Sequence, residues 1–313
     1  MSEFTHFTDE VLPVFLKEHV ESGFVRNSDD QKIAWYKAEH ENEKAMILIV
    51  HGYCGFFGKF HETFYKLYQE GYSVCFMELR GHGNSEGKVK DQRIDVDSFY
   101  QYTDDMHSVV EGVLKKKGRR LFLLAHSMGG AAGALYLEQY PDDFTCAVLS
   151  SPMIQSNFAG LHKPAVDALS VYSKARGWKE EYAPKQHGWD NHYDFENSST
   201  MNEERYAYQF RLRQQNEQYQ TSGATWAWAR AANECTNEIF RNAKKLKTPV
   251  LMFQSGNDGM VNNDGQNLLK EKCPSITLVR IEGAKHELYN GNERVRNKWF
   301  KDMTAFYNAY AKK

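Results

Sequence analysis

The sequence predicts an α/β fold with a mostly parallel, doubly wound sheet and a helical cap insertion. Three observations lead to this prediction. Short apolar runs alternate with amphipathic helical stretches up to Pro152, the chain then becomes polar and rich in Tyr, Trp, Gln and Asn, and the alternation resumes at Pro249. Buried strands that alternate with helices of this length are typical of parallel βαβ units.

The first half of the chain contains five expected strands and three expected helices. The first strand alternates polar and apolar residues, which indicates a half-exposed position, whereas the later strands are continuous apolar runs of the kind that is buried on both faces. The helices show apolar residues at spacings of three and four. The expected strands are 32–38, 45–50, 72–79, 120–125 and 145–150, and the expected helices are 60–69, 99–114 and 128–140.

The second half begins with the insertion and then returns to the core. We expect residues 155–240 to form a helical cap, or lid, because they contain helical stretches and no run typical of a buried strand. Residues 1–154 and 241–313 would together form the α/β core. The expected helices of the cap are 201–220 and 224–242, followed in the core by strands 249–254 and 275–281 and helices 264–272 and 292–311.

Composition excludes several classes of protein. The 39 Lys and Arg residues nearly balance the 41 Asp and Glu residues, so no strongly basic face is expected and nucleic acid is not a predicted partner. Five scattered cysteines without a C-x-x-C pair favour a reducing compartment. Residues 1–10 are acidic rather than cationic, which argues against a secretory signal, and no apolar run reaches the ~18 residues that span a bilayer. We expect a soluble, cytoplasmic protein.

The end of the strand at 120–125 predicts a turn that carries a reactive serine. Ala125 is followed by the residues H-S-M-G-G and then by an Ala-rich helix. A nucleophile elbow places its serine on a tight strand-to-helix turn and needs small residues two positions before and after it, because strand and helix approach closely there. Ala125 and Gly129 meet this requirement. We therefore interpret Ser127 as a nucleophile, and the alternative is a chance S-x-G turn.

Two later strand ends supply the partners that such a serine needs. Asp258 lies in the loop after the next-to-last strand, and His286 lies in the loop after the last strand. The carboxyl ends of parallel strands meet at one edge of a sheet, so we expect both side chains to lie near Ser127. His286 would then be the general base and Asp258 the acid that orients it. Asp264 is the rival acid, but it lies farther from the strand and resembles the N-cap of the next helix.

The loop after the strand at 45–50 is expected to complete the site. Its backbone N–H at Tyr53, together with the N–H of Met128 at the start of a helix, would form an oxyanion hole. Each donor of this kind contributes roughly 3–4 kcal/mol to the stabilisation of the transition state. His51 either supports this loop through a hydrogen bond or acts as a ligand. No second His or carboxylate stands at metal spacing beside it, so no metal is predicted.

Four motifs of the chain match a known family. They are V-H-G at 50–52, R-G-H-G-x-S at 80–85, A-H-S-M-G-G at 125–130 and G-x-x-H at 283–286. With these motifs the chain resembles bacterial lysophospholipases and monoacylglycerol lipases of the α/β-hydrolase superfamily, over most of its length. Residues 197–206 and 223–228 are similar to the lysophospholipase branch, as is the alanine at the elbow. The resemblance implies the α/β-hydrolase fold.

The resemblance also implies an activity and a substrate class. It implies a serine hydrolase that cleaves one fatty-acyl ester of a lysophospholipid or monoacylglycerol through an acyl-enzyme, without a cofactor. The partner is thus a small-molecule lipid, and transient contact with the inner face of a membrane is expected. The cap would hold the acyl chain, with aromatic side chains as its wall; the alternative is that these side chains only pack the cap against the core. They are Trp189, Phe195, Trp226 and Trp228.

Three other functions compete with this interpretation. A general carboxylesterase would use the same site. A serine aminopeptidase of the same fold would need, in addition, a carboxylate that holds the free amine of its substrate, and Glu203 and Glu204 are available in the cap. A non-catalytic binding protein would need only a pocket, and the presence of all three expected catalytic residues argues against it.

Overall fold

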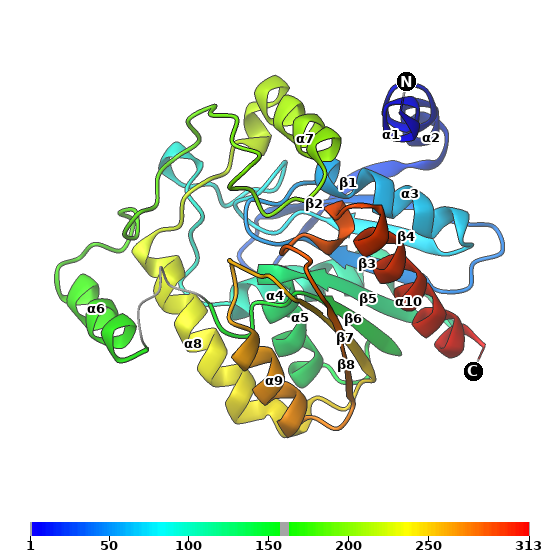
Figure 1. Cartoon of the computed structure of the whole chain (residues 1–313). Helices are drawn as coiled ribbons and strands as arrows, with labels where there is room; N and C mark the ends of the chain where they lie inside the picture. The colour runs from blue at the N-terminus through cyan, green and yellow to red at the C-terminus, as the bar shows by residue number, and fades with distance from the viewer. Residues whose placement is uncertain (1, 157–162, 313) are drawn as a thin grey trace.

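An eight-stranded sheet forms the centre of the computed structural model, which describes residues 2–156 and 163–312 (Figure 1). The strand order is β1-β2-β4-β3-β5-β6-β7-β8. β1 pairs with β2 and β2 with β4 in antiparallel fashion, and every other neighbouring pair is parallel, so the predicted mostly parallel sheet is confirmed. The strands are β1 (Glu21–Arg26), β2 (Lys32–Ala38), β3 (Met46–Val50), β4 (Ser73–Met77), β5 (Leu121–His126), β6 (Cys146–Ser150), β7 (Val250–Ser255) and β8 (Ile276–Ile281).

The strands differ in burial as their sequences require. β3 to β7 are continuously buried, because helices cover both faces of the sheet there. β1 and β8 lie at the two edges: β1 has only exposed and partly buried positions, with Phe24 57% exposed, and β8 is buried only at Ile276 and Ile281. Parallel register places His126 opposite Ser150 and Ser255 opposite Ile281, so the carboxyl ends of these strands lie along one edge.

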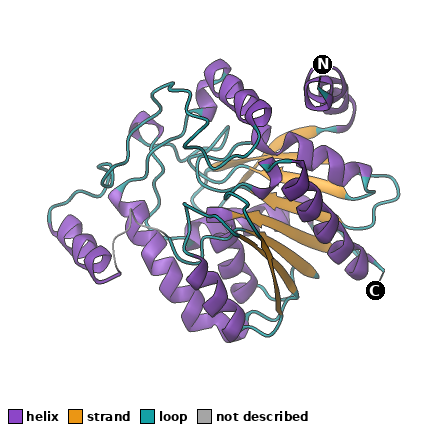
Figure 2. Ribbon diagram, viewed as in Figure 1, coloured by secondary structure: helices purple, strands orange, loops and turns teal. Residues whose placement is uncertain are grey.

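Helices cover the sheet on both faces (Figure 2). The helices pack against the sheet through two buried apolar clusters, one on each face. The helices on the first cluster are α4 (Tyr100–Val109) with its π-helical extension η4 (Val110–Leu114), α5 (Ser127–Gln139), α8 (Trp226–Asn242) and α9 (Asn263–Lys272). Those on the second are α2 (Leu12–His19), α3 (His61–Gln69) and α10 (Glu293–Ala311).

The chain between β6 and β7 forms the segment that lies beside the sheet, towards the left in Figure 1. It contains α6 (Lys163–Ala175), α7 (Glu203–Gln215) and α8, and residues 157–162 of the expected cap lie outside the described part of the chain. Cys235 and Ile239 of α8 belong to the main apolar cluster. The end of α8 therefore packs as part of the core, and the boundaries expected at 155 and 240 stay a prediction.

Short elements complete the chain. The N-terminus folds into α1 (Glu3–His6) and η1 (Phe7–Val11), which run directly into α2. None of the helices in the described ranges combines the length and the apolar character needed to cross a bilayer. The five cysteines are all free, and four of them are buried. The remaining short helices are η2 (Phe57–Phe60), η3 (Lys90–Gln92), η5 (Glu217–Tyr219), η6 (Ala243–Lys245) and η7 (Leu288–Asn290).

Glu138 of α5 is an ionisable group buried in the helical layer. It is 6% exposed, and both its carboxyl oxygens lack a hydrogen-bond partner among the described residues. Burial raises the pKa of Glu138 to about 8; Lys245 opposes this shift and Glu238 adds to it. The native state therefore keeps a proton that the unfolded chain loses above its pKa of about 4.3. The contribution of Glu138 to the free energy of unfolding is therefore fully present below pH ~4.3 and is lost as the pH rises towards 8.

The Glu138→Gln variant, which cannot ionise, is expected to gain stability relative to the wild type as the pH rises. Between pH 5 and pH 8 the difference in the free energy of unfolding should grow by about 3 kcal/mol, because each pH unit in this window costs the wild type up to ~1.4 kcal/mol. Urea denaturation of both proteins at the two pH values measures it. A difference that is the same at both pH values would contradict the buried neutral carboxyl.

Candidate active site

Ser127 lies at the junction of β5 and α5, on the turn expected of a nucleophile elbow. Its φ angle is +53°, in the left-handed region that is unfavourable for residues other than glycine. Such strain persists only where the surrounding structure holds it, and it is common at functional sites. Gly129 makes the turn possible: a Cβ there would lie 2.2 Å from the backbone oxygen of His51 and 2.8 Å from that of Val50. The strand β3 therefore passes directly under the turn.

The Gly129→Ala variant is expected to lose about 3 kcal/mol of stability or more, because the added methyl group meets backbone atoms that cannot rotate away. Urea denaturation monitored by circular dichroism measures the loss. Gly259→Ala is the matched control, since a Cβ at Gly259 has no heavy atom within 4 Å. Equal stability of the two variants would mean that the close approach of β3 to the turn does not constrain residue 129.

The side chains of Ser127, His286 and Asp258 form a chain of two hydrogen bonds. His286 Nε2 lies 2.7 Å from Ser127 Oγ, and His286 Nδ1 lies 2.7 Å from Asp258 Oδ2. The residues come from the end of β5 and from the loops after β7 and β8, so the shared edge of the sheet brings them together. This arrangement suits transfer of a proton from the serine hydroxyl to the imidazole while the carboxylate holds the ring.

Asp258 is held as an ionised hydrogen-bond acceptor. Its side chain is fully buried, and its Oδ1 accepts the backbone N–H groups of Met260 and Val261 at 2.9 and 3.1 Å. Burial alone would raise the pKa of this carboxyl, but the hydrogen bond and charge of His286, followed by the two backbone donors, outweigh burial and lower the pKa below its usual value. The negative charge therefore persists beside His286 at neutral pH.

Asp264, the rival acid, is exposed in the first turn of α9. The expectation that it caps this helix is wrong. Asn262 is the N-cap, because its side-chain oxygen accepts the backbone N–H of Asp264 at 2.9 Å. Asn and Asp share this capping preference, so the pattern N-N-D at 262–264 offers three candidates for one position.

The loop after β3 runs directly beside Ser127. A Cβ on Gly52 would lie 2.8 Å from the Cβ of Ser127, so the next residue, Tyr53, has its backbone close to the serine. Met128 lies in the first turn of α5, where backbone N–H groups have no acceptor within the helix. Both positions fit N–H donors for an oxyanion, and this role stays a prediction.

His51 supports this loop. Its Nδ1 lies 2.7 Å from the backbone oxygen of Gly52, and its Nε2 lies 3.0 Å from the backbone nitrogen of Leu79, which donates to it. Burial, followed by the proximity of His82, lowers the pKa of His51 well below its usual value. The ring is therefore a neutral structural group with both nitrogens in use.

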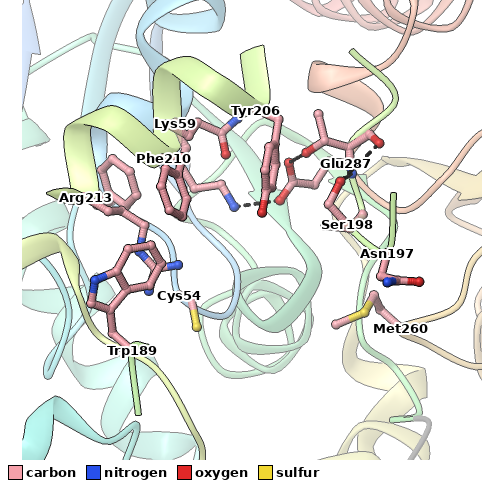
Figure 3. A pocket seen from close by; sticks show the side chains of 14 residues that line it. Cys54, Lys59, Trp189, Asn197, Ser198, Tyr206, Phe210, Arg213, Met260 and Glu287 are labelled. Atoms are coloured by element: carbon pink, nitrogen blue, oxygen red, sulfur yellow. Dashed lines mark hydrogen bonds and ion pairs between the residues drawn. The ribbon is translucent and has the colours of Figure 1, made fainter. Parts of the chain in front are cut away.

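A pocket of about 270 Å³ has in its wall residues that are close in sequence to the candidate site (Figure 3). Cys54, Met260 and Glu287 of its wall lie within two residues of Tyr53, Asp258 and His286, respectively. The remaining wall comes from α7, from the segment before it, and from Phe56 and Lys59 at η2. The lining residues are Cys54, Phe56, Lys59, Trp189, Asn197, Ser198, Ser199, Thr200, Tyr206, Gln209, Phe210, Arg213, Met260 and Glu287.

The four aromatic residues expected to line the substrate site do not lie together. Trp189 lines the pocket. Phe195 instead packs near Tyr206, Trp226 near Trp178, and Trp228 is 7% exposed in the main apolar cluster. The centre of the Trp228 ring lies 5.3 Å from that of Tyr53, so Trp228 packs against the loop after β3.

Lys59 and Glu287 form a buried ion pair in the pocket wall, with Nζ and Oε1 2.6 Å apart. Glu287 also accepts hydrogen bonds from the side chains of Thr200 and Asn290. Burial would raise the pKa of Glu287, but Lys59 outweighs it and holds the pKa far below its usual value. Because Glu287 follows His286 and its N–H donates to the backbone oxygen of Ser199, this network ties the segment before α7 to the histidine loop.

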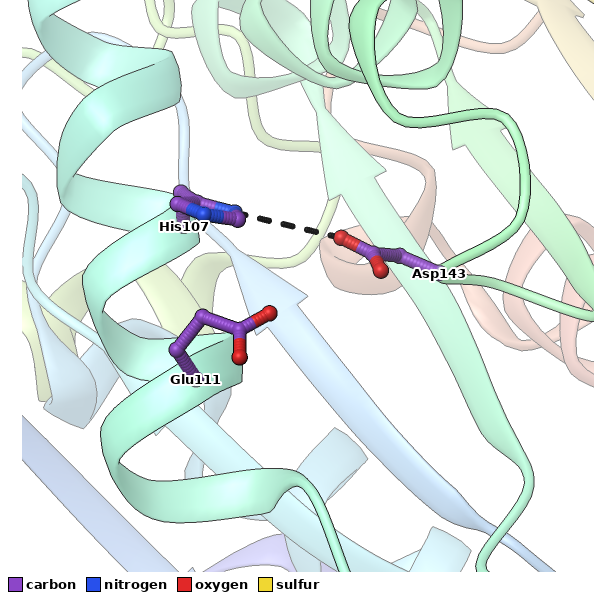
Figure 4. A group of neighbouring side chains, drawn as sticks. All are labelled: His107, Glu111 and Asp143. Carbon is purple, nitrogen blue, oxygen red and sulfur yellow. Dashed lines mark ion pairs between the residues drawn. The ribbon is translucent and has the colours of Figure 1, made fainter.

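One group among the described residues has the spacing of a metal site: His107, Glu111 and Asp143 (Figure 4). Lys115 forms ion pairs with both carboxylates, 2.9 Å from Asp143 Oδ1, so an ammonium already supplies the positive charge. The His107 ring contacts the hydroxyl of Tyr136. None of the three is in contact with the chain of Ser127, His286 and Asp258, and none lines the pocket. The chemistry of the group fits a structural ion-pair cluster.

Residues 41–293 match a family model described as "Serine aminopeptidase, S33", a family of α/β-hydrolases. The chain belongs to this family. It is a hydrolase related to lysophospholipases and monoglyceride lipases, as the resemblance in its motifs implied. The family match does not by itself select the substrate.

The relatives and solved structures agree with this assignment. A probable lysophospholipase L2 of Haemophilus influenzae is 29% identical, and the match covers 96% of this chain and 95% of that protein. Human monoglyceride lipase is 26% identical, with 83% and 81% covered. The crystal structure of a soluble variant of monoglyceride lipase from Saccharomyces cerevisiae, solved with a substrate analogue, superposes with a TM-score of 0.72 at 18% identity and covers 93% of this chain and 94% of that one. This likeness confirms the predicted α/β-hydrolase fold.

Proposed function

We propose that this hydrolase cleaves the acyl ester of a lysophospholipid or a monoacylglycerol, with Ser127 as its nucleophile. The observation that carries the proposal is the pair of 2.7 Å contacts that His286 makes with Ser127 and Asp258. The names of the relatives support the substrate class, because lysophospholipase and monoglyceride lipase both denote hydrolysis of a lipid with one acyl chain.

The proposed reaction begins with proton transfer from Ser127 Oγ to His286 Nε2 as the oxygen attacks the ester carbonyl. Nδ1–H of His286 donates to Asp258, which leaves Nε2 as the acceptor that this step requires. The tetrahedral oxyanion binds the N–H groups of Tyr53 and Met128. The imidazolium then protonates the glycerol oxygen as it leaves, and a water molecule repeats the sequence on the acyl-enzyme, releasing the fatty acid.

An aminopeptidase reaction needs a carboxylate that is free to bind the substrate's ammonium group. The only carboxylate in the lining of the described pocket is Glu287, which Lys59, Thr200 and Asn290 already occupy. Glu203 and Glu204, the candidates in the sequence, are exposed at the start of α7 and do not line this pocket. The charge arrangement therefore favours an ester substrate over a free amino terminus.

A substrate panel tests the proposed function. Monoacylglycerols, lysophosphatidylcholines, p-nitrophenyl esters and aminoacyl arylamides are assayed with the wild type and with Ser127→Ala as the blank. We expect hydrolysis of one or both lipid classes and none above background with the variant. Preferential cleavage of the arylamides would replace the proposal with a peptidase, and cleavage of only the p-nitrophenyl esters would replace it with a general carboxylesterase.

A further inference from the structure

One face of α7 forms a wall of the pocket. Tyr206, Gln209, Phe210 and Arg213 all line it, and their spacing of three and four residues puts them on the same side of the helix. Arg211 is exposed, and its guanidinium lies over the ring of Tyr208, which does not line the pocket. Of the two neighbouring arginines, only Arg213 thus presents its charge to the pocket.

The guanidinium of Arg213 is fixed in position but has no carboxylate partner. Nε and Nη2 each donate to a backbone oxygen at 3.0 Å, those of Tyr219 and Thr221. The ring of Trp189 lies 4.0 Å from the guanidinium carbon, and Figure 3 shows the two side chains together at one side of the pocket. Within residues 2–156 and 163–312, Arg213 forms no ion pair and Nη1 has no hydrogen-bond partner. The charge and one N–H edge are therefore available to a ligand.

Gln209 provides a second unsatisfied polar group, one turn away. It is only 7% exposed, and its amide makes no hydrogen bond with any residue that the structure describes. Polar groups that are fully buried nearly always pair with protein or water, and the Gln209 amide is not among the fully buried unpaired groups of the described residues, so it is open to the pocket. Because Gln209 lines the pocket on the same face as Arg213, its amide group supplies further donors next to the guanidinium.

The charges of the pocket wall add up to one unpaired positive charge. Lys59 and Glu287 neutralise each other through their ion pair, and Arg213 is the third charged residue of the lining. The part of the wall around Arg213 and Gln209 does not suit an acyl chain, because an acyl chain packed there would remove water from a charged group. This part suits an anion of moderate size. Guanidinium groups bind phosphate oxygens particularly well, since their planar N–H groups match phosphate geometry.

We propose that Arg213 and Gln209 form a head-group site that binds the phosphate of a lysophospholipid while its ester lies at Ser127. This inference rests on the proposed function and deepens it, because it selects lysophospholipids over uncharged monoacylglycerols. The position of the pocket agrees with this selection: Cys54, Met260 and Glu287 of its wall adjoin the oxyanion loop, the acid loop and the histidine. A glycerol backbone joins phosphate and ester in the substrate, so the two groups have to bind at adjoining places.

The test compares two substrates with the same short acyl chain, a lysophosphatidylcholine and a monoacylglycerol, at concentrations below micelle formation. Arg213→Gln should lower kcat/KM for the lysophosphatidylcholine roughly 10- to 100-fold, the effect of losing a charged hydrogen bond. For the monoacylglycerol, kcat/KM should change less than about threefold, which is smaller than the loss expected when a charged hydrogen bond is removed. Arg213→Lys should recover part of the loss, and Arg211→Gln, the matched control on the same helix, should leave both substrates unchanged.

Equal losses on both substrates in a folded Arg213→Gln protein would overturn the head-group site. A second measurement needs no variant: sn-glycerol 3-phosphate should inhibit hydrolysis of the monoacylglycerol competitively, more weakly as salt is added, whereas glycerol at the same concentration should not. Absence of this inhibition would also overturn the site. If the wild type hydrolyses neither lipid, the proposed function fails instead, so the two failures are distinguishable.

Discussion

The His286→Ala variant is expected to lower kcat for an acyl ester by roughly 10⁵- to 10⁶-fold, the scale observed when the base of a serine triad is removed. Without the imidazole, Ser127 Oγ loses the acceptor 2.7 Å away that would take its proton, and the leaving alcohol loses its proton donor. Steady-state hydrolysis of a p-nitrophenyl ester measures the effect.

The control is His6→Ala, because the His6 side chain is 51% exposed on α1 and is not part of the pocket wall. Its kcat should equal that of the wild type. Because His286 lies on a loop tied to the segment before α7, the circular dichroism spectrum and unfolding midpoint of His286→Ala have to be measured as well. A folded His286→Ala enzyme that keeps more than a hundredth of the wild-type rate would contradict its role as general base.

The Asp258→Asn variant is expected to lower kcat about 10⁴-fold with little change of structure. The Asn oxygen would keep the hydrogen bonds from the N–H groups of Met260 and Val261. The amide nitrogen would then face His286 Nδ1 and donate to it, which leaves the ring proton on Nε2. That nitrogen could no longer accept the proton of Ser127.

Asp264→Asn provides the matched control for this variant, since Asp264 is the neighbouring carboxylate and is exposed on α9. It should retain the wild-type rate, and the rates of both variants should be compared across the pH range. If Asp264→Asn loses activity and Asp258→Asn does not, the acid of the site has been assigned to the wrong residue.

The buried strands, and the convergence of Ser127, Asp258 and His286 at their ends, could be predicted from the sequence; the catalytic roles of these residues stay a prediction. β3, β5 and β7 begin and end within one residue of the expected ranges, because strands covered on both faces must be continuously apolar. The N-terminal helices and β1 were not predicted. β1 is an edge strand with no continuous apolar run, and Pro13 argues against a helix unless it falls in the first turn, as it does in α2.

The pocket could not be predicted, because it depends on where α7 packs. Between Glu203 and Gln215 the helix carries polar residues on several sides, and its sequence alone does not show which face is covered. The aromatic pattern of the expected cap does not indicate the pocket either, because Trp226 and Trp228 of α8 contact other aromatic neighbours. The available signal was the spacing of Gln209 and Arg213, two polar residues that share a helix face with Tyr206 and Phe210.

Covalent labelling tests the central claim most directly. The wild type is treated with a fluorophosphonate, digested and analysed by mass spectrometry, beside the His286→Ala variant. If the hydrogen-bonded chain of Asp258, His286 and Ser127 activates the serine hydroxyl, the adduct lies on the peptide that contains Ser127 in the wild type and is lost in the variant. An adduct on another residue, or equal labelling of Ser127 in both proteins, would contradict it.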